Sequence, residues 1–202
     1  MSVTFYSVEL EKAREKLVEH LLEGTKPAVL ARFDGGVMAI AVNESEFRKI
    51  RRVHDRFLFV AAGDHADINE AHSALVSFAV QVESTFSERD LNFDILVDGP
   101  GSVVSQMAHI FQSAMTRPKA VQFILYSLAD EPARGVVVSP TGGRKYIKPA
   151  GVVGGKMESE PAISGTSLQE VMESGKAFLR LREPNAKMFE IGILRKAGDV
   201  IP

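Results

Sequence analysis

The sequence predicts an α+β protein in which helices cover the outer faces of two packed β-sheets. Apolar runs of strand length occur in groups of four, three and one, and segments with helical periodicity precede and separate these groups. The strand runs are apolar almost throughout, which is typical of strands that are buried on both faces. No linker, repeat or low-complexity tract divides the 202 residues, so one domain is expected. Strands grouped around consecutive helices favour helices layered outside two sheets.

The first predicted element is an amphipathic helix over residues 8–23. Ser7 is a suitable N-cap, and Gly24 is a natural residue to follow the last helical turn. The apolar residues that recur at helical spacing are Leu10, Ala13, Leu17 and Leu21. Ahead of this helix, Val3 to Tyr6 form a short apolar tip.

Two pairs of strands are predicted next. Residues 27–33 and 37–42 flank Asp34-Gly35-Gly36, a combination that is typical of a tight hairpin turn because Asp and Gly tolerate positive φ. Residues 49–55 and 56–63 form the second pair. Both strands of the hairpin are nearly continuous apolar runs, so both faces of the hairpin are expected to be covered.

The remaining elements are predicted from the same two periodicities. Helices are expected over residues 66–87, after the Gly99-Pro100-Gly101 break, and from about Ser167 to Leu181. Strands are expected over residues 120–129, 134–140, 144–155 and 186–196. Thr141-Gly142-Gly143 is the predicted turn between the second and third of these strands.

Composition and charge exclude several classes of function. The formal net charge is −2, so the chain offers no basic field for nucleic acid and no attraction to an anionic membrane. The absence of Cys removes disulfides, thiolate catalysis and thiolate metal sites, and it fits a reducing compartment. Residues 1–23 carry charges throughout and no later run approaches about 18 apolar residues, so neither a signal peptide nor a membrane span is predicted. We expect a cytoplasmic protein.

Metal and cofactor sites are not predicted. Asp64, His65, Asp67 and His72 form the densest group of possible metal ligands, but an acidic helix start with solvated His explains this spacing better than a zinc site. The Gly-rich turns match neither pattern of phosphate-binding loop, and no G-x-S-x-G nucleophile elbow occurs. The basic residues Arg48, Lys49, Arg51 and Arg52 are typical of a solvated strand edge. No cofactor and no metal are therefore expected.

An ordered set of segments carries a resemblance to a known family. These segments are the helix that ends at Gly24, DGGVMAIAVNES (34–45), HDRFLFVAAG (54–63), RPKAVQFILYSLAD (117–130), and SPTGG with AGVVGG (139–155). Over about residues 5–196 the chain resembles the α subunit of the proteasome core particle, most closely its bacterial, actinobacterial-type form. The resemblance implies the four-layer αββα sandwich of N-terminal-nucleophile hydrolases with an N-terminal helix. Residues 1–202 would then be one α-type domain, with a gating tip at 1–7, a helix at 8–24 and the sandwich at 25–202.

The resemblance also implies a function without catalysis. Such a subunit forms a homo-oligomeric ring, expected to be heptameric, that templates β subunits, gates the access of protein substrates and docks an ATPase or other ring activator. Lys49 resembles the residue that receives the C-terminal carboxylate of an activator, with Gly24 close to it, although Lys49 also reads as one surface cation among four. The residues implied in gating are Ser2, Val3, Thr4, Phe5 and Tyr6.

Two alternatives remain open at this point. Catalytic relatives use an N-terminal Thr whose hydroxyl is activated by its own α-amine, so Thr25 is the rival nucleophile of a self-processing threonine hydrolase. Its expected supporting groups are missing, because Ala41 and Val42 stand near the position of the acid and Phe57 stands in place of the Lys. A divergent ring without a β partner is the other alternative. The segment after Gly155 is also shorter than in the family, so a thin outer helical layer is expected.

Overall fold

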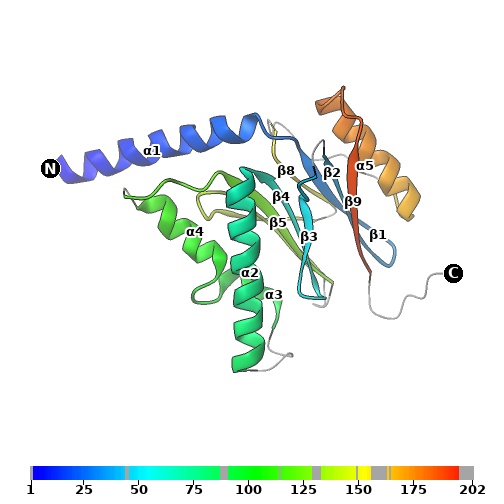
Figure 1. Ribbon diagram of the computed structural model, residues 1–202, viewed down its shortest axis with the longest axis horizontal. Helices are drawn as coiled ribbons and strands as arrows, with labels where there is room; N and C mark the ends of the chain where they lie inside the picture. Colours follow the sequence, from blue (N-terminus) through cyan, green and yellow to red (C-terminus); the bar gives the residue numbers. More distant parts are fainter. Residues whose placement is uncertain are drawn as a thin grey trace.

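Two antiparallel sheets packed face to face form the centre of the computed structural model (Figure 1). The structure describes residues 2–43, 46–86, 91–113, 115–128, 133–148, 150–155, 163 and 165–195, with side chains from Val8 onward. Three helices cover one outer face of the pair of sheets, one helix covers the other outer face, and a long N-terminal helix crosses one end (Figure 1). This arrangement confirms the predicted αββα sandwich with an N-terminal helix.

The first sheet has four strands in the order β8-β1-β2-β9. Their bounds are Ala150–Val153 for β8, Ala28–Phe33 for β1, Gly36–Val42 for β2 and Phe189–Arg195 for β9. The second sheet has five strands in the order β3-β4-β5-β6-β7. Their bounds are Ile50–Val53, Phe57–Gly63, Val121–Ser127, Arg134–Val138 and Arg144–Tyr146. All neighbouring strands are antiparallel.

Five helices are present in the described residues. Their bounds are Ser2–Glu23 for α1, His65–Thr85 for α2, Phe93–Asp98 for α3, Val103–Gln112 for α4 and Leu168–Arg182 for α5. Helices α2, α3 and α4 pack on the second sheet, whereas α5 alone among the described helices packs on the first sheet. The segment after Gly155, from which a thin helical layer was expected, lies mostly outside the described residues.

Apolar side chains fill three layers of core, one between the sheets and one under each helical layer. Leu30, Leu58 and Ile124 represent the layer between the sheets, and all three are buried. Phe59 packs under α2 to α4, and Ile40 packs under α5. Because successive residues of a strand point to opposite faces, strands buried on both sides require apolar residues at nearly every position. The near-continuous apolar runs of the sequence are explained by this double burial.

The β1–β2 hairpin and most other predicted elements are confirmed. Asp34 and Gly35 form the turn, and Gly35 has a φ of 87°, a conformation that Gly adopts without steric strain. Gly142 has a φ of 79° in the turn before β7, as its sequence context predicts. The remaining strands and the helices after residue 65 lie within a few residues of their predicted bounds.

Two predictions of local structure are wrong, and one short helix was not predicted. Helix α1 begins at Ser2 rather than at residue 8, because extending an existing helix is easier than nucleating one and Ser7 therefore does not interrupt it. Helix α3 was not predicted, since it has only six residues; Asn92 caps it by accepting a hydrogen bond from the N–H of Ile95 at 3.0 Å. The single strand predicted over residues 144–155 is two strands in different sheets, β7 in the second sheet and β8 in the first.

Candidate functional site

The junction between α1 and β1 brings together most of the residues that the sequence singles out. Thr25 lies there, half-buried, and its hydroxyl donates a hydrogen bond to the carbonyl of Leu22 at 2.7 Å. The N–H of Thr25 donates to the same carbonyl at 3.0 Å. Thr25 thus satisfies a carbonyl of the last turn of α1 that has no partner within the helix. In the intact chain its nitrogen is a peptide amide and not the free amine that a threonine nucleophile requires.

Lys49 lies beside this junction, and its side chain is buried at 7% exposure. Its ammonium donates to the carbonyls of Lys26 at 3.0 Å and Val42 at 3.1 Å. A buried ammonium is strongly unfavourable without such acceptors, so these bonds fix the position of the charge. The backbone of Lys49 is held as well, because its N–H donates to Oε2 of Glu190 at 2.8 Å.

The structure therefore places Lys49, and not the residue at position 57, close to Thr25. The carbonyl of Lys26, to which Lys49 donates, belongs to the residue that follows Thr25. Phe57, which stands at the predicted position of the base, is fully buried in the core under α2 to α4. In the sequence, Lys49 is marked only by its place directly before the strand that starts at Ile50. The direction of its side chain becomes clear only from the pairing of the strands.

Two apolar residues occupy the region expected for a catalytic acid. Ala41 is buried between the sheets, and Val42 is buried under α5, both at 0% exposure. Val42 takes part in the junction through its backbone, since its carbonyl accepts from Lys49 and its N–H donates to the carbonyl of Pro27 at 3.1 Å. Neither side chain can hold or move a proton.

Two glycines lie beside Thr25, one at the open surface and one at a close approach of β8. Gly24 is exposed, and a Cβ added to it would have no atom within 4 Å. Gly154 has a φ of 75°, and a Cβ added to it would lie 2.5 Å from the Cβ of Ala62 and 3.0 Å from the hydroxyl oxygen of Thr25. Gly154 is therefore required for the close approach of β8 to the junction. The junction is also tied to the end of α5, since Lys26 pairs with Glu183 at 2.6 Å.

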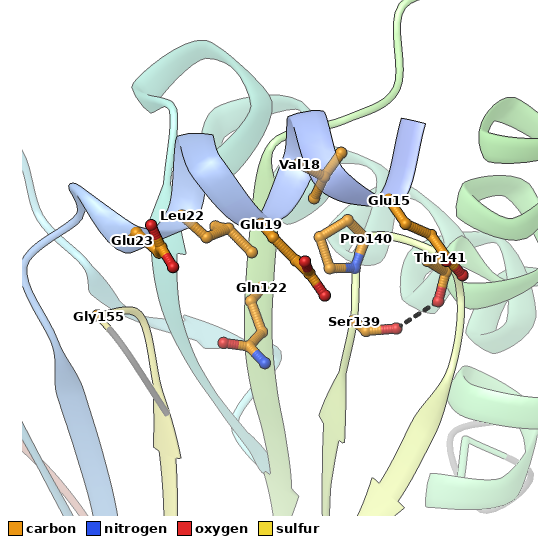
Figure 2. A pocket seen from close by; sticks show the side chains of 10 residues that line it. All are labelled: Glu15, Val18, Glu19, Leu22, Glu23, Gln122, Ser139, Pro140, Thr141 and Gly155. Atoms are coloured by element: carbon orange, nitrogen blue, oxygen red, sulfur yellow. Dashed lines mark hydrogen bonds between the residues drawn. The ribbon is translucent and has the colours of Figure 1, made fainter. Parts of the chain in front are cut away.

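A cleft of about 400 Å³ lies under α1 and extends to this junction (Figure 2). Glu15, Glu19 and Glu23 stand four residues apart on α1 and give one wall a negative charge. Figure 2 shows Gln122 and the hydrogen-bonded hydroxyls of Ser139 and Thr141, whose oxygens are 2.7 Å apart, across from the helix. Apolar surface comes from Val18, Leu22 and Pro140. Gly155, next to Gly154, closes the end that reaches the junction.

Helix α1 turns a different face to the domain than its apolar residues suggest. Among the described side chains of α1, Arg14 and Val18 are the buried ones, and the guanidinium of Arg14 donates to the carbonyl of Ile110 at 3.0 Å. The leucines that define the predicted apolar face remain open to solvent; Leu10 is 42% exposed, Leu17 47% and Leu21 41%. Their spacing of seven and four residues places them on one stripe of the helix. In the isolated chain this apolar stripe is uncovered.

The four residues weighed as metal ligands point to different partners. Asp64 caps α2, and Asp67 accepts two hydrogen bonds from Arg117 at 2.8 Å each. His65 stacks on Phe47, with ring centroids 4.0 Å apart. His72 donates through Nε2 to the carbonyl of Arg52 at 2.9 Å, so its neutral form carries the proton on that nitrogen. Among the described residues, no three His, Cys, Asp or Glu side chains lie together as a metal site.

None of the described helices combines the length and the apolar character that crossing a membrane requires. Ser2 to Tyr6, the residues predicted to act in gating, lie in the first turns of α1. Lys49 and Gly24, the predicted docking residues, both lie at the α1–β1 junction, where Lys49 bonds to the carbonyl of the second residue after Gly24. The structure thus brings the predicted docking residues Lys49 and Gly24 and the rival nucleophile Thr25 into one site.

Comparison with known proteins identifies the family. No curated protein matches the chain. A family model described as proteasome subunit matches residues 23–173, a range that starts at the α1–β1 junction and ends within α5. The match contains Gly24, Thr25, Lys49 and all strands except β9. Since it covers more than half of the 202 residues, and the fold is the expected sandwich, the chain belongs to the proteasome subunit family.

Proposed function

We propose that this chain is a non-catalytic α-type subunit of a cytoplasmic proteasome core particle. Proteasome subunits assemble into rings with other subunits. In this proposal copies of the chain form the outer ring, template β subunits, restrict the access of protein substrates and dock an ATPase or other ring activator. The observation that carries the proposal is the apolar character of the positions at which a threonine hydrolase would need its acid and its lysine, since Ala41, Val42 and Phe57 are all fully buried. Thr25 therefore lacks, at those positions, the groups that would activate a nucleophile.

The exposed stripe of α1 supports the formation of a ring. Leu10, Leu17 and Leu21 are each about half exposed, and together they form an apolar surface along the helix. Burial of apolar surface stabilises association by about 25 cal/mol per Å² before the entropy of association is subtracted. A neighbouring copy of the chain would cover this stripe in the ring, for which we propose seven members.

The α1–β1 junction supports a role in docking an activator. Lys49 provides a positive charge that two carbonyls fix in place, and Gly24 leaves open space at the surface of the same junction. A C-terminal carboxylate would gain a charge-assisted hydrogen bond at such an ammonium. The glutamates of the cleft under α1 would repel a carboxylate, so they favour its placement at the Lys49 end.

The first turns of α1 are proposed as the gate. Figure 1 shows α1 projecting past the rest of the molecule at its N-terminal end. In a ring of such subunits, projecting segments would meet near the axis and obstruct the pore. Ser2 to Tyr6 are the residues at this end of the helix.

The test is a comparison of peptide and protein degradation by a particle assembled with a β subunit. Lys49→Ala should abolish the stimulation of protein degradation by an activator, whereas the hydrolysis of a small fluorogenic peptide should be unchanged. Lys26→Ala is the matched control, because this lysine lies at the same junction but is 39% exposed and pairs with Glu183. Deletion of residues 2–7 should raise basal peptide hydrolysis. Normal stimulation of the Lys49→Ala particle would exclude the docking role, and unchanged basal hydrolysis after the deletion would exclude the gate.

A self-processing threonine hydrolase is the second candidate, and one observation favours it. The ammonium of Lys49 donates to the carbonyl of Lys26, the residue that follows Thr25, and the exposed Gly24 would allow cleavage before Thr25. Intact-mass measurement separates the two candidates. A mature chain that starts at Met1 or Ser2 excludes the hydrolase, whereas a chain that starts at Thr25 supports it.

A further inference from the structure

Two edge strands lie next to each other on one side of the sandwich. Strand β9 is the last strand of the first sheet, and β3 is the first strand of the second sheet. A Cβ added to Gly192 of β9 would collide with the side chain of Ile50 of β3, so the two edges are in direct contact. A groove of about 780 Å³ follows this pair of edges, with β9 on one side and the arginines of β3 on the other.

The edge of β3 is closed by side chains. Since the N–H of Ala61 donates to the carbonyl of Lys49, alternation along the ladder turns the backbone groups of Ile50 and Arg52 outward. The outward N–H of Ile50 donates to Oε1 of Glu190 at 3.2 Å. The outward carbonyl of Arg52 accepts from His72 at 2.9 Å. These bonds occupy two of the four outward groups through which another strand would pair.

The edge of β9, in contrast, is open. The N–H of Asn43 donates to the carbonyl of Met188, so the even-numbered residues of β9 bond to β2 and the odd-numbered residues point outward. In the described part of the chain, the outward N–H and carbonyl groups of Ile191 and Ile193 make no hydrogen bond. Such an unpaired edge is a template for pairing with another strand. Strand β9 contains neither Pro nor Lys, the residues that commonly protect an edge.

The charges beside this edge are predominantly positive. Arg48 and Arg52 are exposed in the groove, and Arg51 is held with its guanidinium 4.8 Å above the ring of Phe47. Among the described residues, the carboxylates that line the groove belong to Glu46 and Glu190. Glu190 is already engaged, because it accepts from the N–H groups of Lys49 and Ile50 and from the side chain of Asn43 at 3.2 Å. The groove is therefore complementary to an anionic segment.

The two faces of β9 specify where the side chains of an added strand would lie. Phe189 and Ile193 pack under α5, whereas Gly192 and Leu194 face the second sheet. Arg52 shares with Ile50 the face of β3 that is turned toward the first sheet, because side chains alternate along a strand. An added strand would thus place alternate residues beside apolar side chains on the α5 side, and the residues between them beside Arg52.

We propose that the edge of β9 binds an extended segment of a partner protein in which acidic and apolar residues alternate. The segment adds a fifth strand to the first sheet. Its backbone pairs with the outward groups of Ile191 and Ile193, its acidic side chains meet Arg48 and Arg52, and its apolar side chains extend the layer under α5. Main-chain hydrogen bonds supply affinity in this mode of recognition, and the alternating side chains supply specificity. The proposal depends neither on Thr25 nor on the assembly of a ring.

The test uses fluorescein-labelled VEVEVEV, whose length matches the seven residues of β9, and measures fluorescence anisotropy with the full chain at low salt. The lysine counterpart VKVKVKV should bind at least about tenfold more weakly. VEVEPEV, which keeps all three acidic side chains but lacks the N–H of one valine that would face β9 in antiparallel pairing, should not bind. Arg52→Glu should weaken binding of VEVEVEV by about tenfold, since a like charge then faces the peptide. Lys12→Glu on α1 is the matched control and should bind normally, because Lys12 is exposed and lies far from the groove in the sequence and on another element.

A second variant tests the backbone pairing. Ile191→Pro removes an outward N–H and leaves the bonds between β9 and β2, so a strand edge tolerates it better than an interior position. It should abolish binding while circular dichroism retains the folded spectrum. If Ile191→Pro does not fold, the charge series with Arg52→Glu decides alone. No binding of VEVEVEV, equal binding of VKVKVKV, or normal binding to Arg52→Glu overturns the proposal. A dimer in native mass spectrometry that Ile191→Pro dissociates would assign the edge to a second copy of the chain and overturn it as well.

Discussion

Substitution of Thr25 by Ala separates the two accounts of this chain. In the α-type account, the hydroxyl of Thr25 has one structural role, the hydrogen bond to the carbonyl of Leu22 at 2.7 Å. Loss of a hydrogen bond of this kind costs about 1 kcal/mol. The N–H of Thr25 still donates to the same carbonyl, at 3.0 Å, so that carbonyl keeps one partner. For a chain of this size, about 1 kcal/mol lowers Tm by about 2–4 °C.

The assay has a stability part and an activity part. Thermal unfolding of Thr25→Ala should give the small decrease in Tm, and Thr25→Ser, which keeps a hydroxyl, should lie close to the natural chain. Peptide hydrolysis by the particle assembled with a β subunit should be the same for all three. A nucleophile would behave differently, because its removal lowers the rate by a factor of about 10⁴ or more. A Thr25→Ala variant that folds and assembles but has lost hydrolysis would refute the α-type reasoning.

Three further predictions address stability, pH dependence and assembly. Gly154→Ala should lower the free energy of unfolding by about 2–3 kcal/mol in urea titrations, because the new Cβ meets Ala62 at 2.5 Å and φ is 75°. Gly155→Ala, whose new Cβ has no contact closer than 3.8 Å, should lower it by about 1 kcal/mol. Equal losses for the two variants would contradict the close approach at Gly154. Burial lowers the pKa of His72 below its usual 6.5, with the hydrogen bond to Arg52 opposing and the charge of Arg51 adding to the decrease. Because the unfolded chain takes up this proton at higher pH than the folded chain, the free energy of unfolding should fall as pH decreases below about 6.5. His72→Gln should therefore make Tm less dependent on pH between about 7 and 5. An unchanged pH dependence of Tm would exclude His72 as its source. Leu17→Glu should leave the Tm of the isolated chain within about 2 °C, since Leu17 is 47% exposed, and should prevent ring formation in native mass spectrometry; an intact ring would show that the stripe is not an interface.

Local sequence signals predicted most of the fold. The hairpin of β1 and β2 follows from Asp34-Gly35 between apolar runs, since the turn needs residues that accept positive φ and the flanks need burial on both sides. Helix α2 follows from helical spacing and from the carboxylate of Asp64, which accepts hydrogen bonds from two N–H groups of the first turn. These signals lie within a few residues of the structure they determine.

The orientation of α1 could not be predicted in this way. Its apolar periodicity points to Leu10, Leu17 and Leu21, but Arg14 turns toward the domain because its guanidinium reaches the carbonyl of Ile110, 96 residues away in the sequence. A cationic side chain can bury its stem and still find an acceptor. The helix therefore keeps its leucines available for a neighbour, which only the tertiary contact reveals.

The contacts around Thr25 could not be predicted from local sequence signals either. Phe57 stands at the position expected for a catalytic lysine. Lys49 reaches the junction instead, because β2 and β3 bring it beside the carbonyls of Lys26 and Val42. Glu190 fixes the backbone of Lys49 from β9, 141 residues away. Long-range pairing of this kind has no local signature. The residues that the sequence did identify, Gly24, Thr25 and Lys49, nevertheless lie together in one site.

Native mass spectrometry of the purified chain, with an intact-mass measurement of the subunit, tests the central claim most directly. The α-type account predicts an unprocessed chain that keeps residues 2–24 and assembles into a seven-membered ring, alone or on a β subunit. A ring that recruits no β subunit would instead indicate the stand-alone assembly. A subunit whose first residue is Thr25 would contradict the account and identify a processed hydrolase.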